Sequence, residues 1–242
     1  MHIHLPKALH GWREVAREMT IIIASVLIAL FAEQLVQQWE WRQKVRAAEA
    51  AMRGELLGDD GPELYQRAAI HPCLLSRLHA MRAAIEAGRS RRQVYALIDS
   101  YWVPFHTYET LAHDAANASD VAGHMDVDHH DLFNQAYGMM PSLDRTSAVE
   151  VADVAKLGAL RRSGGALSEA ETSQLLLTLQ ALRDDERIMW AGARFALPRV
   201  RELRQPLQPD VIVPLMQVAR QHYGTCVRDL PASWPSGLAQ DP

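Results

Sequence analysis

A chain of 242 residues with 48% hydrophobic residues and a formal net charge of -4 is long enough for one globular domain and an additional segment. The weak charge, mixed in sign, provides no basic face, so the composition argues against a nucleic-acid-binding protein. Alternating β-branched runs are scarce, whereas apolar residues recur at three- and four-residue spacing, which predicts an all-α fold.

The first predicted element is a membrane-spanning helix near the N-terminus. Its uncharged run extends only from Met19 to Ala32, which is short for a span, but Trp12 precedes it and Trp39 and Trp41 follow it. A helix rises about 40 Å between Trp12 and Trp39, which matches a bilayer with its headgroup layers. We therefore expect these three tryptophans to lie at the two membrane interfaces.

Two alternatives to an uncleaved signal anchor remain open, a cleaved signal peptide and a soluble core helix. Cleavage after Ala32 would require a small residue where Leu30 stands. The helical pattern also continues beyond Leu35 without a break, so we favour the uncleaved anchor.

The basic residues on the two sides of the span are equal in number, and so determine the orientation only weakly. They are Lys7, Arg13 and Arg17 before it and Arg42, Lys44 and Arg46 after it. Short segments that precede a signal anchor usually stay in the cytoplasm, and we adopt that orientation.

Residues 4–57 contain LPKALHGWREVAREMTIIIASVLIALFAEQLVQQWEWRQKVRAAEAAMRGEL. This segment resembles the N-terminal signature of a family of uncharacterised proteobacterial single-pass inner-membrane proteins, which commonly carry HGWREF, an apolar run, ALGAEQ and an HWR-like segment. Ser25 and Phe31 depart from that signature, because small glycines are frequent there in the family. The resemblance implies a bacterial inner-membrane location and a helical periplasmic domain, and it implies no catalytic residue.

The domain organisation follows from these features and from the breaks further along the chain. We expect a cytoplasmic segment over residues 1–17, a transmembrane helix over 18–37, a helical stalk over 38–57, an extracytoplasmic helical domain over 58–230 and a disordered tail over 231–242. The stalk carries a narrow apolar seam of Val45, Ala48, Met52 and Leu56. The seam suits packing on the helical domain, which we favour, or a parallel contact with a second copy of the chain.

Helix boundary signals divide the rest of the chain. Residues 58–62, GDDGP, predict a break with Asp60 as the N-cap of the next helix. That helix should end before Gly88, Ser90 should cap a third helix, and Ser168 with Glu171 forms a capping box that opens a long helix. The other helices are expected over residues 107–116, 128–140, 142–162 and 211–223, and together they predict an antiparallel helical bundle.

The clearest candidate for metal chemistry is HMDVDHHD, residues 124–131. The candidate metal ligands within it are His124, Asp126, His129 and His130. Their spacing fits no standard zinc signature, and Asp128 with Asp131 fits a helix N-cap with a supporting acid. We therefore expect no structural metal in this stretch, and we assign no cofactor to the chain.

A second dense segment is SYWVPFHTY, residues 100–108, which contains five aromatic residues. Such a segment could line a ligand pocket or an interface, but its position at a proline bend favours packing between helices. The chain has no nucleophile elbow and no phosphate-binding glycine loop, so no catalytic residue is assigned.

Cys73 and Cys226 are the only cysteines in the chain. If the helical domain lies outside the cytoplasm, an isolated pair will tend to be oxidised. We expect a disulfide that joins the first and last helices of the domain, with two buried thiols in a cytoplasmic domain as the alternative.

The functional hypothesis is a membrane-anchored, non-enzymatic envelope protein whose helical domain binds an unknown protein partner. The expected partners are the lipid bilayer and that protein, without nucleic acid, and self-association of the chain is left open. The alternative is a small-ligand or metal-binding sensor domain that acts through a separate membrane partner. The expected location is the inner membrane, in a single pass, with the N-terminus in the cytoplasm and the C-terminal domain in the periplasm.

Overall fold

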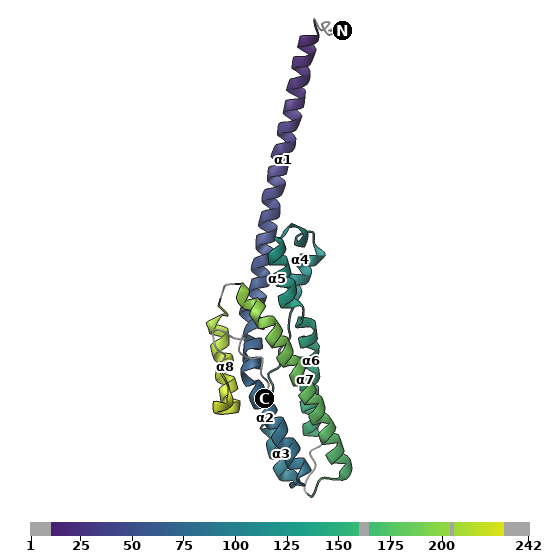
Figure 1. Ribbon diagram of the computed structural model, residues 1–242, viewed down its shortest axis with the longest axis vertical. Coiled ribbons are helices and arrows are strands. Elements are labelled where there is room, and N and C mark those ends of the chain that lie inside the picture. The colour runs from purple at the N-terminus through teal and green to yellow at the C-terminus, as the bar shows by residue number, and fades with distance from the viewer. Residues whose placement is uncertain (1–10, 160–164, 204–205, 230–242) are drawn as a thin grey trace, which may run out of the picture. The chain divides into compact units, whose positions relative to one another are not determined.

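The computed structural model describes residues 11–159, 165–203 and 206–229 (Figure 1). Within these ranges every regular element is a helix and no strand occurs, which confirms the all-α prediction. In chain order the elements are α1 (Trp12–Glu55), η1 (Leu56–Asp60), α2 (Gly61–Glu86), α3 (Arg91–Asp99), α4 (Leu111–Ala118), η2 (Ala122–His124), α5 (Val127–Tyr137), α6 (Met140–Ala159), α7 (Glu169–Glu202), α8 (Pro209–Tyr223) and η3 (Gly224–Cys226). The chain divides into two compact units, Met1–Ala47 and Ala48–Pro242. The predicted disordered tail lies outside the described residues.

The first unit contains most of α1. The sequence of α1 has neither proline nor glycine between Trp12 and Arg53. The helix is long and apolar enough to span a membrane, and none of its most apolar 18-residue stretch is buried. The hydroxyl groups within it are satisfied locally. Thr20 donates to the carbonyl of Ala16 at 2.8 Å and Ser25 to that of Ile21 at 2.5 Å, so neither hydroxyl requires water.

The predicted break at residues 58–62 is wrong, because the chain continues through it as the π-helical turn η1. Asp60 has helical backbone angles (φ −64°, ψ −40°) and makes no capping hydrogen bond. The amide of Gly61 instead donates to the carbonyl of Leu56, five residues back. A Cβ at Gly61 would lie 2.2 Å from that carbonyl oxygen, so this turn requires glycine. Pro62 follows in the first turn of α2, a position that tolerates proline.

Most of the other boundary signals are confirmed. Gly88 has a positive φ of 63° just after α2 ends, and Ser90 with Gln93 forms a capping box at the start of α3. Ser168 and Glu171 form the predicted capping box of α7. The N-cap of α5 is Asp126, whose carboxylate accepts from the amides of Asp128 and His129, so the prediction of Asp128 as the cap is wrong by two residues.

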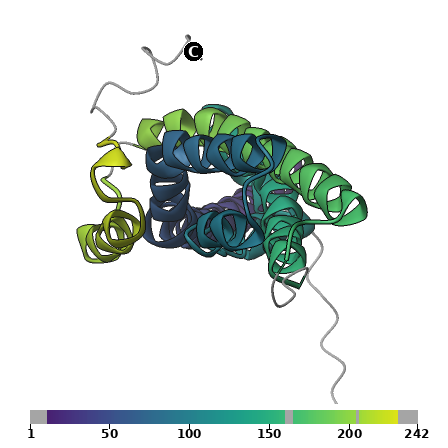
Figure 2. The ribbon, with the colours of Figure 1, turned by 90° about the horizontal axis from the view of Figure 1, so that it is seen from below.

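The helices of the second unit pack around α2 and α7, which lie side by side (Figure 1). α7 also packs against α5 and α6, and α2 packs against α3 and α8. Seen along the helices, α8 lies on one side of α2 and α6 on the other (Figure 2). Met52 and Leu56 of the predicted seam are buried within this unit, which agrees with packing on the helical domain.

One large apolar cluster fills the part of the second unit where α2, α3, α7 and α8 meet. Its fully or almost fully buried members include Ile70, Leu74, Met81, Val94, Leu157, Leu175, Leu182 and Ala219. Cys73 belongs to the same cluster and lies at disulfide distance from Cys226, with 5.7 Å between the Cα atoms. The predicted pairing is thus confirmed at the level of distance, and it ties the segment after α8 to α2.

Candidate functional site

Three polar side chains on one face of η1 and α2 are buried in the interior of the second unit. Asp60, Arg67 and His71 are seven and four residues apart, a spacing that places them on the same side of a helix. They are 0%, 1% and 6% exposed. Because buried polar groups must find partners, each defines a contact with another part of the chain.

Arg67 forms the centre of the larger cluster. Its Nη2 donates to Glu150 Oε1 on α6 at 2.5 Å and also to Glu186 Oε2 on α7. The three side chains are at most 1% exposed. One guanidinium therefore joins α2, α6 and α7 at the same point.

His71 extends this cluster along α2. Its Nδ1 lies 2.6 Å from Glu186 Oε1, and its ring stacks on Trp190 with the centroids 4.5 Å apart and the planes within 5°. Since an ionised carboxylate can only accept hydrogen bonds, Nδ1 carries the proton when Glu186 is charged. Glu186 is thus held by Arg67 through one oxygen and by His71 through the other.

The charges of this cluster are unevenly compensated. Burial would lower the pKa of Arg67, but the carboxylates of Glu150 and Glu186 outweigh burial and raise it. Burial raises the pKa of Glu150 above its ordinary value, and the lowering by Arg67 does not cancel this effect. Within the described residues, Arg67 Nε and Nη1, Glu150 Oε2 and the Tyr101 hydroxyl are buried without a hydrogen-bond partner. The cluster is closed to solvent, and its hydrogen bonds join three helices.

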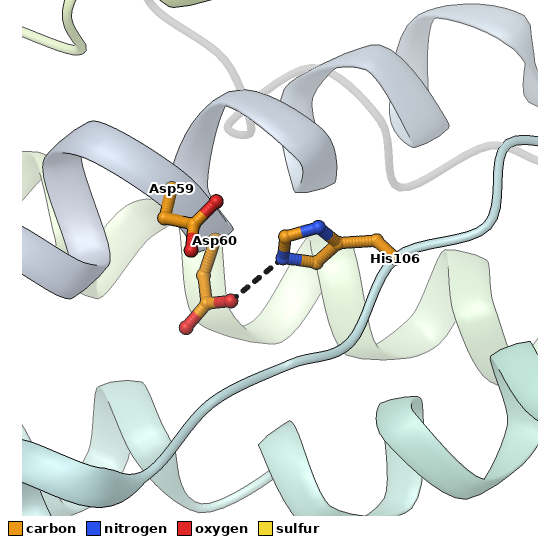
Figure 3. Close-up of side chains that lie close together, drawn as sticks. All are labelled: Asp59, Asp60 and His106. Atoms are coloured by element: carbon orange, nitrogen blue, oxygen red, sulfur yellow. Dashed lines mark hydrogen bonds and ion pairs between the residues drawn. The ribbon is translucent and has the colours of Figure 1, made fainter.

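A second polar cluster lies at the π-helical turn. Figure 3 shows Asp59 and Asp60 at the end of η1 and His106 directed toward them from the segment before α4. His106 Nε2 lies 2.9 Å from Asp60 Oδ1, and one ligating atom from each of the three residues lies within 4.8 Å of the others. Asp59 is exposed, the Asp60 side chain is 0% exposed and that of His106 is 13% exposed.

Negative charge dominates the surroundings of this second cluster. Burial raises the pKa of Asp60, against the hydrogen bond and charge of His106. Burial also raises the pKa of Glu63, one turn further along α2, and the charges of Asp59 and Asp60 raise it further. For His106 burial lowers the pKa, but the hydrogen bond to Asp60 and the neighbouring carboxylates raise it overall.

The metal candidates from the sequence do not converge. Within the described parts of the chain, one group of three metal-ligating side chains has its donor atoms close together. It consists of Asp59, Asp60 and His106. Asp126 caps α5, His129 lies 3.1 Å from Glu49, and His130 lies 3.5 Å from Asn117. Each of these candidates is therefore directed toward another protein group, and His124 likewise has a partner.

Asp60 and His106 lie in two segments with distinctive composition, but nothing in the sequence pairs them. GDDGP was interpreted as a helix break and SYWVPFHTY as aromatic packing. The packing interpretation holds for Tyr101 and Tyr108, which are buried, but not for Phe105, which is 60% exposed. No local signal relates residue 60 to residue 106, because only the folded chain brings them together.

The remaining predicted positions concern the membrane and the open surface. Trp12 and Trp39 of the predicted membrane-interface residues are 77% and 62% exposed. A separate open pocket of about 330 Å³ is lined by Ala50, Arg53, Gly54, Leu57, Pro206 and Gln208. The guanidinium of Arg53 pairs with Glu49 at 3.0 Å, so the charge nearest this pocket is already compensated.

No family model matches the chain, and comparisons with curated proteins and with solved structures find no similar protein.

Proposed function

We propose that this chain is a membrane-anchored, non-enzymatic envelope protein of the bacterial inner membrane. Its N-terminus lies in the cytoplasm, and its helical domain, an antiparallel bundle that follows a helical stalk, lies in the periplasm and binds another protein. The observation that carries the proposal is the apolar stretch of α1, none of whose most apolar 18 residues is buried. Lipid is the environment in which such a surface is stable.

The cysteine pair supports the periplasmic side. Cys73 and Cys226 lie at disulfide distance across 153 residues of sequence. Disulfides persist in the periplasm and are rare in the cytoplasm. The N-terminal resemblance to single-pass inner-membrane proteins implies the same location.

Protein binding is proposed because the larger polar cluster, around Arg67, is enclosed, whereas several large apolar side chains are exposed. Leu111, Val127 and Leu177 are 69%, 72% and 68% exposed. Exposed apolar side chains contribute to a protein interface when a partner removes them from water.

Location is tested first. Alkaline carbonate washing should leave the full chain in the membrane pellet, and protease added to spheroplasts should degrade the helical domain while an N-terminal tag stays protected. Recovery in the wash would refute the anchor, and a domain that is protected from protease would refute the orientation.

Binding is tested by cross-linking in intact cells followed by purification from gently solubilised membranes. The control is a chain shortened to residues 1–57, which keeps the span and loses the domain. A protein captured by the full chain and not by the control supports the proposal. Identical captures from both chains would refute a role of the domain in binding.

The second candidate function is a ligand-responsive or metal-responsive sensor. The observation that favours it is the convergence of Asp59, Asp60 and His106 at a π-helical turn, an irregularity that is frequent at functional sites.

A further inference from the structure

We propose that Asp59, Asp60 and His106 bind a divalent first-row transition-metal cation. The three side chains come from segments 46 residues apart, and one ligating atom from each lies within 4.8 Å of the others. One imidazole nitrogen with two carboxylate oxygens is a ligand set that suits zinc and its neighbours better than magnesium or calcium.

The distances are close to those of a bound site. Two ligands that are each about 2.1 Å from a tetrahedral ion lie about 3.4 Å apart. His106 Nε2 and Asp60 Oδ1 are 2.9 Å apart, so they need to separate only slightly. Asp59 is exposed and free to turn its carboxylate toward the ion. The ion would take the place of the proton that Asp60 and His106 share.

Asp60 supplies an independent reason to expect a cation. Its side chain is 0% exposed, and its Oδ2 makes no hydrogen bond of acceptable geometry within the described part of the chain. A backbone hydrogen bond from Glu109 to this carboxylate lowers the pKa of Asp60, but the Oδ2 atom itself meets no donor with hydrogen-bond geometry. A buried carboxylate oxygen without a partner is costly unless a cation or a donor reaches it.

The neighbouring charges favour a cation as well. Glu63 lies on α2, one turn before Arg67. The charges of His106, Asp59 and Asp60 act on its carboxylate. The charges of Glu63, Asp60 and Asp59 also act on His106, so three carboxylates lie near one histidine. A divalent ion would compensate this excess of negative charge.

The π-helical turn explains why two consecutive aspartates face one site. A π-helical turn contains more residues than an α-helical turn, so neighbouring side chains diverge by a smaller angle. The hydrogen bond from Gly61 to Leu56 holds this turn in place. The smaller angle lets the exposed carboxylate of Asp59 lie near the buried carboxylate of Asp60.

The test uses the full chain in detergent, stripped with a chelator and titrated with ZnCl₂ in a calorimeter, with Co²⁺ absorption as a second readout. We expect one ion per chain and no comparable binding of Mg²⁺. D59N should weaken zinc binding by at least about tenfold, and H106Q by as much or more. D59N changes an exposed side chain, so it decides the question even if H106Q unfolds.

The matched control is H129A/H130A, which removes the two adjacent histidines of residues 124–131 and should leave zinc affinity within about twofold. The proposal is overturned if the wild-type chain binds no zinc, if D59N binds as tightly as the wild type, or if binding is lost only in H129A/H130A. Because the purified chain is used, these results do not depend on membrane orientation or on a protein partner.

Discussion

Arg67 on α2 donates a hydrogen bond to Glu150 on α6 over 2.5 Å, and both side chains are 1% exposed. The same nitrogen donates to Glu186 on α7, so one buried cation holds two buried carboxylates. Pairs of this kind add little net stability compared with apolar residues, but removing one member leaves the other charges uncompensated.

Replacing Arg67 with methionine, which keeps most of its volume, should therefore destabilise the helical domain by about 3–5 kcal/mol. The free energy of unfolding is measured by urea denaturation of the chain in detergent. The matched control is R92M at an exposed position, which should change stability by no more than about 0.5 kcal/mol.

Much of the loss in R67M should be recovered when Glu150 and Glu186 are both replaced by glutamine, because the uncompensated charges are then gone. An equal denaturation midpoint for R67M and the wild type would contradict the structural role of this cluster.

The stability of the domain should fall as the pH rises from about 4 toward 8. Burial raises the pKa of Glu150, and burial with the charges of Asp153 and Asp184 raises that of Asp185 to about 6. For an acid whose pKa is raised by folding, the contribution is complete below the unfolded pKa and is lost as the pH rises through the folded pKa.

The E150Q variant isolates the contribution of Glu150 to this pH dependence of stability. Its free energy of unfolding, measured by urea denaturation at several pH values, should decrease less over this range than that of the wild type. E202Q, at an exposed position, should follow the wild-type curve. Parallel curves for E150Q and the wild type would show that Glu150 does not titrate in this range.

Loss of the disulfide should lower stability without abolishing the fold. The bond would close a loop across 153 residues, for which the chain-entropy model gives an upper estimate of about 5 kcal/mol. C73A/C226A should accordingly lower the free energy of unfolding by about 2–5 kcal/mol, as measured by denaturation with and without reductant. Reductant should shift the wild type and leave the variant unchanged.

Thiol trapping supplies the complementary measurement. Protein blocked with maleimide in intact cells should show no free cysteine before reduction and two afterwards. Two labelled thiols without reduction would exclude the bond, and would also count against the periplasmic location.

The π-helical turn should not tolerate a side chain at Gly61. A Cβ there would lie 2.2 Å from the carbonyl oxygen of Leu56 and 2.7 Å from Leu207 Cδ2. G61A should destabilise the domain by about 1–3 kcal/mol through this clash. The matched control is G54A, because a Cβ at Gly54 meets nothing within 4 Å and the substitution favours the helix by up to about 1 kcal/mol. Equal stability of the two variants would mean that the turn relaxes freely.

Local signals determined most helix boundaries from the sequence alone. The capping box of Ser168 and Glu171 depends on hydrogen bonds between residues three apart in the sequence. Such bonds form without any contact to the rest of the chain. Periodicity likewise identified the helices, and the presence of only two cysteines left one intramolecular pairing to consider. The same local reasoning failed at Asp60, where glycine and proline suggested a break but the chain continued through a π-helical turn.

Only the tertiary structure decided which polar residues meet. Arg67 is separated from Glu150 by 83 residues and from Glu186 by 119, and Asp60 is separated from His106 by 46. Periodicity shows which face of a helix a residue occupies, but not which other helix that face contacts. That choice depends on how all the apolar surfaces pack at once, so both polar clusters became visible only when the helices were placed together.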